Sequence, residues 1–201
     1  MNRRKLLTLA AATLAAVLLP VATAVAVTDA DLPEAKRSDA KLYLTAKEAD
    51  AMVRANPQKV LFLDVRTRAE VVYVGMPTQA DANVPLRLEW GDAPQFDQEK
   101  KTLKQRDNPD FVAEVARRLA AKGLTSNDPV ILLCRSGDRS ASAADLLFAA
   151  GYKQAYSVVE GFEGDVAKEG PTKGQRTVNG WKNAGLPWTY AMDPAKMYRV
   201  N

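Results

Sequence analysis

Histidine is absent from this chain of 201 residues, and cysteine occurs only once, at Cys134. Without histidine the chain cannot form a Ser-His-Asp triad or a His-ligated metal site. With a single cysteine it cannot form an intramolecular disulfide. A free cysteine is often a small buried core residue, so the residues around Cys134 must decide whether it is structural or reactive.

The first 26 residues have the three parts of a secretory signal peptide. Residues 3–5 are basic, residues 6–21 are uncharged and rich in Leu and Ala, and Ala24 and Ala26 supply the small residues of a cleavage site. We therefore expect residues 1–26 to direct export, to the periplasm in a bacterium, and both the general secretory and the twin-arginine routes stay open. An uncleaved segment would instead anchor the chain in the membrane.

The charge balance gives no sign of a nucleic-acid partner. The chain carries 28 Lys and Arg residues against 24 Asp and Glu residues. Residues 1–26 hold three of the basic residues and none of the acidic ones, so the rest of the chain is nearly neutral. Because a nucleic-acid-binding surface needs a concentrated positive charge, we expect no nucleic-acid partner.

Short apolar runs alternate with helix-forming segments over most of the chain. Continuous apolar runs rich in strand formers indicate strands buried on both faces, whereas apolar residues at helical spacing indicate helices. The pair Thr45 and Glu48 has the spacing of a capping box at a helix start. Strands are predicted at residues 60–65, 82–85, 129–134 and 155–159, and helices at residues 45–55, 109–122, 141–150 and 181–186. This alternation predicts one α/β domain with a mostly parallel sheet.

Three segments fall outside this pattern. Residues 27–40 are polar and are predicted to form a flexible leader, and residues 191–201 are predicted to form a C-terminal tail. Residues 86–108 are polar with scattered aromatics, including Trp90 and Phe96, and are predicted to form a long insertion loop. Loops of this length in compact domains are often functional.

Cys134 ends the most apolar of the predicted strands, and the segment from Arg135 to Ser140 leads into a helix. In parallel α/β folds, ligands bind at this kind of junction. The turn directs backbone N–H groups toward one point, and the helix dipole adds partial positive charge. Gly137 permits backbone angles that strain other residues, and Arg135 and Arg139 add two positive charges. These features favour an anion, including the thiolate of Cys134, a nucleophile that needs no histidine base.

The loop resembles that of a known family. The segment Cys134-Arg135-Ser136-Gly137-Asp138-Arg139-Ser140 resembles the C-R-S-G-x-R-S active-site loop of single-domain rhodaneses. Asp64-Val65-Arg66 with Glu70 resembles the family's D-V-R-x-x-x-E signature, and Asn83-Val84-Pro85 resembles its N-I-P signature. Residues 159–162 and 185–187 resemble its closing region. The resemblance spans residues 41–190, which we expect to form one domain.

The resemblance implies a fold and an activity. The fold is a five-stranded, mostly parallel sheet flanked by helices. The activity is sulfur transfer, in which Cys134 takes sulfane sulfur from a small anionic donor such as thiosulfate and holds it as a persulfide. The acceptor would be cyanide, a thiol or a protein, and no metal or organic cofactor is implied.

The resemblance also assigns roles to other residues. Arg139, together with Arg135, would hold the anionic donor. Asp64 and Arg66 would support the loop, and a plain salt bridge is the alternative role for these two residues. The persulfide would lie in a cradle of backbone amides from Arg135, Ser136, Gly137, Asp138, Arg139 and Ser140.

Three alternatives stay open. Cys134 could be a core residue before an ordinary turn, although two arginines and a glycine fit a sealed core poorly. A cysteine phosphatase or arsenate reductase would place the arginine after five intervening residues, whereas four separate Cys134 from Arg139, which gives a smaller loop suited to one sulfur atom. The third alternative is a sulfur-relay or protein-binding module with little turnover of small donors. In such a module the insertion at residues 86–108 would be the docking surface.

Overall fold

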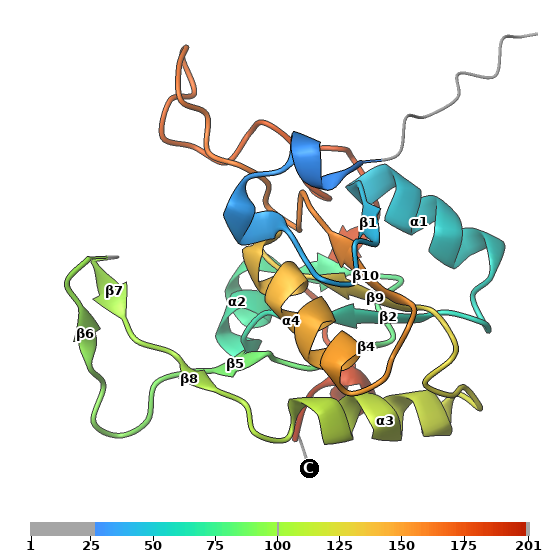
Figure 1. Cartoon of the computed structure of the whole chain (residues 1–201). Coiled ribbons are helices and arrows are strands. Elements are labelled where there is room, and N and C mark those ends of the chain that lie inside the picture. The colour runs from blue at the N-terminus through green and yellow to red at the C-terminus, as the bar shows by residue number, and fades with distance from the viewer. Residues whose placement is uncertain (1–26, 100, 200–201) are drawn as a thin grey trace, which may run out of the picture.

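The structure is a computed structural model that describes residues 27–99 and 101–199 (Figure 1). The expected signal peptide, residues 1–26, lies outside the described residues. Within the described ranges, no helix has both the length and the apolar character needed to cross a membrane.

A five-stranded sheet forms the centre of the domain, with the strand order β1-β10-β9-β2-β4. Every neighbouring pair is parallel, and Leu63 of β2 lies beside Leu132 of β9. This sheet confirms the predicted fold, and the four predicted strands are consecutive in it. The strands are Tyr43–Leu44 (β1), Leu61–Asp64 (β2), Ala82–Asn83 (β4), Val130–Leu133 (β9) and Ala155–Val158 (β10).

Four α-helices pack around the sheet. The first begins at a capping box, as predicted, because Thr45 and Glu48 each accept a hydrogen bond from the other's backbone N–H. The second has only seven residues, too few to show helical periodicity in the sequence. The helices are Ala46–Ala55 (α1), Arg68–Val74 (α2), Phe111–Ala121 (α3) and Asp138–Ala149 (α4).

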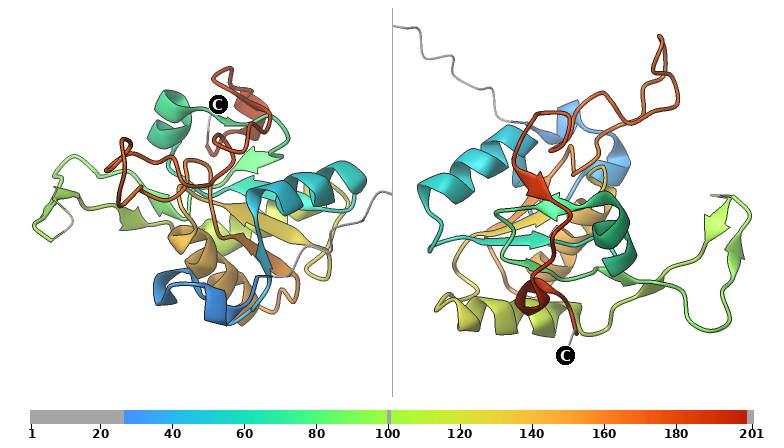
Figure 2. Two further views of the ribbon diagram at one scale, coloured as in Figure 1. Left: turned by 90° about the horizontal axis from the view of Figure 1, so that it is seen from above. Right: turned by 180° about the vertical axis from the view of Figure 1, so that it is seen from behind.

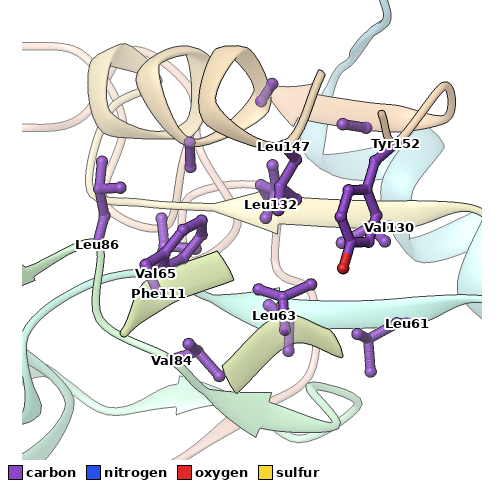
Figure 3. Packing of buried hydrophobic residues seen from close by; sticks show 14 of the residues in the cluster. Leu61, Leu63, Val65, Val84, Leu86, Phe111, Val130, Leu132, Leu147 and Tyr152 are labelled. Carbon is purple, nitrogen blue, oxygen red and sulfur yellow. The ribbon is translucent and has the colours of Figure 1, made fainter. Parts of the chain in front are cut away.

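Alternate residues of the central strands belong to two separate hydrophobic clusters, because successive side chains of a strand point to opposite faces. One cluster packs the sheet against α3 and α4, and Figure 3 shows Leu63 and Leu132 there beside Leu147. The other packs the sheet against α1, α2 and the C-terminal segments, with Phe62 and Trp181 at its centre. Burial of both faces explains why β2 and β9 are continuous apolar runs.

The segment predicted as a long loop at residues 86–108 is instead an arm of short antiparallel strands. Its outer part projects from the body of the domain in every view (Figures 1 and 2), whereas Leu86, Leu88 and Asn108 at its base are buried. The pairing of β5 with β8 closes its base, and β6 pairs with β7 further out. Strands of two residues leave no alternation in the sequence, so the prediction of a loop was wrong. The strands are Arg87–Leu88 (β5), Phe96–Asp97 (β6), Thr102–Leu103 (β7) and Arg106–Asp107 (β8).

Residues 181–186, predicted to form a short helix, form turns instead. The amides of Trp181 and Lys182 donate to the carbonyls of Gly161 and Phe162 rather than to carbonyls of their own segment. These bonds fasten the C-terminal region to the segment that follows β10. Within the segment, the Ala184 amide donates to the Gly180 carbonyl and the Gly185 amide to the Lys182 carbonyl, which closes single turns without a continuous helix.

The segments predicted as a flexible leader and a C-terminal tail both pack on the domain. In the leader, which contains the 3-10 helices Asp29–Asp31 and Glu34–Lys36, the ammonium of Lys36 lies 2.7 Å from the Asp165 carboxylate. In the tail, Met197 and Tyr198 are buried. The tail follows β11 (Trp188–Thr189), which pairs with β3 (Met76–Pro77), and contains the 3-10 helix Pro194–Lys196. Long-range contacts of this kind have no signature in a polar sequence.

Substitution of Trp181 tests the packing of the second cluster. The ring is fully buried, lies 5.3 Å from the Phe62 ring between centroids, and donates through Nε1 to the Pro187 carbonyl. We expect Trp181→Ala to lower the free energy of unfolding by about 3–5 kcal/mol, as buried aromatic truncations do. Trp90→Ala, on the exposed part of the arm, should change it by less than about 0.5 kcal/mol. Urea denaturation measures both, and equal losses would contradict this assignment of the core.

Candidate active site

The loop that carries Cys134 connects β9 to α4 at the carboxyl end of the sheet. β9 ends at Leu133 and α4 begins at Asp138, with Gly137 at the N-cap. Gly137 has φ of +109°, and a Cβ atom there would lie 2.2 Å from the Val159 carbonyl oxygen. Only glycine satisfies both the backbone angle and this close approach. The helix therefore starts three residues earlier than predicted, directly after the loop.

The segment that follows β10 holds the outer side of the loop through its backbone. The carbonyl of Cys134 accepts from the Phe162 amide at 2.7 Å, and the carbonyl of Arg135 accepts from the Glu163 amide at 3.0 Å. Gly161 lies against the same stretch, because a Cβ atom there would approach the carbonyl carbon of Arg135 to 2.4 Å. These contacts fix the peptide planes of the loop.

Cys134 is fully buried, and its sulfur has two polar neighbours. The Gly137 amide donates to Sγ at 3.0 Å, and Sγ lies 3.7 Å from Oδ1 of Asp138. Of the amides in the predicted cradle, the Gly137 amide contacts the sulfur in this structure. The Ser140 hydroxyl is also buried and has no hydrogen-bond partner among the described residues.

Arg139 does not present a free positive charge. Its guanidinium makes two hydrogen bonds of 2.6 Å with the carboxylate of Glu70, and the Arg139 side chain is 8% exposed. Burial alone would raise the pKa of Glu70, but the hydrogen bonds and charge of Arg139 outweigh burial and lower that pKa to about 2. Burial opposes the charged form of Arg139 as well, and Glu70 reverses this to raise the arginine's pKa. The role predicted for Arg139, holding an anionic donor, stays a prediction: its guanidinium is paired with Glu70 and also lines the cleft beside the loop.

Asp64 and Arg66 form a buried ion pair next to the loop. The Nη2 atom of Arg66 lies 2.6 Å from Oδ2 of Asp64 and donates to the Gly75 carbonyl. Its guanidinium stacks on the Phe162 ring at 4.0 Å, and the Phe162 amide holds the Cys134 carbonyl. The Asn83 side chain donates to the carbonyls of both members of the pair. This arrangement agrees with the supporting role predicted for Asp64 and Arg66.

A cleft beside the loop has a volume of about 400 Å³. Arg135 and Asp138 are exposed on the side of the loop, and the arm supplies the opposite wall. No pattern in the sequence predicts that the arm reaches the loop, because the two segments are distant along the chain. The lining residues are Glu70, Arg87, Asp97, Thr102, Leu103, Lys104, Gln105, Arg135, Asp138 and Arg139.

Comparisons with known proteins identify a family through one family model. The family model of the rhodanese-like domain matches residues 45–168. An uncharacterised protein of Rickettsia rickettsii, the RP600 homolog, is 32% identical over 128 residues, which are 64% of this chain and 81% of the relative. The crystal structure of Rv0390 from M. tuberculosis has 32% identity and a TM-score of 0.56, and the match covers 74% of this chain and 97% of that chain. The solution structure of a polysulfide-sulfur transferase homodimer from Wolinella succinogenes has 20% identity and a TM-score of 0.46, with 77% and 81% covered.

Gly161→Ala tests the backbone contact that holds the loop. Gly161 and Gly185 have similar positive φ values, +64° and +70°, but a Cβ atom at Gly185 meets nothing within 4 Å. We expect Gly185→Ala to cost about 1 kcal/mol of unfolding free energy from backbone strain alone. Gly161→Ala should cost at least about 2 kcal/mol more, because loop and segment must separate. Chemical denaturation compares the two variants, and equal costs would show that the contact is loose.

The pair between Glu70 and Arg139 predicts a loss of stability in acid. Because the folded-state pKa of Glu70 is lowered to about 2, the stabilisation is complete above its unfolded pKa of about 4.3 and is lost as the pH falls toward 2. Glu70→Gln should cost about 3 kcal/mol at neutral pH, and its difference from the wild type should shrink between pH 4 and 2. Urea denaturation across this range measures both proteins. A difference that stays constant with pH would exclude the charged pair as its source.

Proposed function

This chain belongs to the rhodanese-like domain family, and from that premise we propose that it transfers sulfane sulfur through a persulfide on Cys134. The observation that carries the proposal is the contact of Sγ with the Gly137 amide at 3.0 Å, at the N-terminus of α4. An anionic sulfur is stabilised there by an N–H donor and by the helix dipole.

Each half of the proposed reaction is a displacement at sulfur. The Cys134 thiolate attacks the sulfane sulfur of the donor, and the donor's S–S bond breaks. With thiosulfate, sulfite leaves with the electron pair. An acceptor such as cyanide or a thiol then attacks the terminal sulfur, and the Cys134 thiolate is regenerated as the leaving group. Arg66, Asp64 and the pair of Glu70 with Arg139 hold the loop in place during both steps.

We propose that this chemistry takes place outside the cytoplasm. The support is the charge and apolar pattern of residues 1–26, which is that of a secretory signal peptide. Sulfur donors and acceptors would then be those present in the periplasm, where the lone Cys134 has no second cysteine in the chain with which to form a disulfide.

The arm favours a second candidate function, the docking of a protein. Its side chains Trp90 and Phe96 are 48% and 51% exposed, and exposed aromatic side chains of this size are typical of interaction surfaces. In a relay, the docked protein would receive the sulfur. In a binding module, docking would occur without turnover of small donors.

Intact mass spectrometry tests the proposed function. After incubation with thiosulfate or polysulfide, we expect the protein to gain about 32 Da, one sulfur atom, and to lose it on addition of cyanide. Cys134→Ala is the matched control and should gain nothing, since it removes the nucleophile and little volume. No gain in the wild type with either donor, while Cys134 is reduced and the protein is folded, would favour the binding module.

A further inference from the structure

Asp138 supplies the charged group that contacts the reactive sulfur. Its Oδ1 atom lies 3.7 Å from Sγ of Cys134, and its side chain is exposed at the edge of the cleft. As the first residue of α4, it is held near the sulfur by the start of the helix rather than by a flexible loop. A donor that enters the cleft therefore lies close to this carboxylate.

The two arginines predicted to hold an anionic donor are placed differently in the structure. Arg139 makes two hydrogen bonds with Glu70; burial opposes its charge, and the charges of Glu70, Cys134 and Asp138 raise its pKa. Arg135 and Asp138 are both exposed to solvent, where charges are partly screened. Asp138 contacts the sulfur at 3.7 Å.

The remaining charges lie further out along the cleft. Arg87 and Lys104 line it from the arm, together with Asp97, and Arg87 is also 3.7 Å from Asp107. Arg176 belongs to the same neighbourhood: burial lowers the pKa of its guanidinium, and the charge of Arg135 adds to that effect. The entrance thus holds side chains of both signs, with Arg87, Lys104 and Arg176 as its cations, whereas the side chain in contact with the sulfur is negative.

We propose that Asp138 determines donor specificity, favouring donors with a single negative charge beside the sulfane sulfur over dianions such as thiosulfate. The inference rests on the proposed function of Cys134 and names the substrate class of that site. Each negative charge on the donor is repelled by the carboxylate, so a dianion loses twice as much free energy as a monoanion at the same distance. The cations at the entrance attract both kinds of donor.

An alkanethiosulfonate is a donor of the favoured class. It has the sulfonyl-linked sulfane sulfur of thiosulfate, but one charged oxygen is replaced by an alkyl group. The Cys134 thiolate forms a bond to the sulfane sulfur, the bond from that sulfur to the sulfonyl group breaks, and the electron pair leaves with an alkanesulfinate. Atoms and charge balance as they do for thiosulfate and sulfite, and no oxidant is needed.

The test compares kcat/KM for methanethiosulfonate and for thiosulfate, with cyanide as the acceptor. At about 6 Å in a water-like dielectric, one charge pair changes a rate constant by roughly threefold. Asp138→Asn should therefore raise kcat/KM about threefold for the monoanion and about tenfold for the dianion, so that the preference for the monoanion falls about threefold. The change should shrink at about 1 M ionic strength, where the Debye length is about 3 Å.

Glu169→Gln is the matched control. Glu169 is exposed and lies outside the cleft, so this variant changes the net charge equally and should leave the preference unaltered. Asp138→Asn with an unchanged preference, or with equal losses for both donors, would overturn the specificity role while leaving the proposed function intact. Failure of the wild type to take up sulfur from either donor would overturn both.

Discussion

The geometry of the site depends on a short set of backbone hydrogen bonds at the carboxyl end of the sheet. The carbonyls of Cys134 and Arg135 accept hydrogen bonds from the amides of residues 162–164. These bonds orient the peptide groups of the loop so that the Gly137 N–H reaches the sulfur. The bonds form only because Gly137 and Gly161 allow two segments to approach to a distance that excludes a Cβ atom. Backbone contact of this kind positions a donor without any side chain that could change rotamer.

A layer of buried charges surrounds these bonds and keeps the neighbouring elements in register. The pair of Glu70 with Arg139 joins α2 to α4, while the pair of Asp64 with Arg66 lies beneath Phe162. Buried ion pairs add little to net stability because their desolvation is costly, but breaking one leaves an unpaired charge. In this fold the two ion pairs hold the loop in one arrangement. The charge near the loop therefore depends on how its arginines are paired, and not only on how many there are.

The sequence was sufficient to predict the centre of the fold and to single out the Cys134 loop, but not to predict what surrounds them. β2 and β9 carry the continuous apolar pattern of strands buried on both faces, so they could be predicted, and the Cys134 loop has a specific motif. β1 and the strands of the arm have two residues each, which is too short for any pattern. The partner of Arg139 lies 69 positions away, and no local signal reveals that its charge is already used.

The base of the arm bears on how this protein could change over evolutionary time. The arm begins at β5 and ends at β8, and these two strands pair with each other. The two ends of the arm therefore stay together whatever residues lie between them. The closure entropy of such a segment rises only slowly with its length, and the core gains or loses nothing when residues are added at its tip. One wall of the cleft can therefore be rebuilt by insertion, deletion or recombination while the Cys134 loop on the other wall is inherited unchanged.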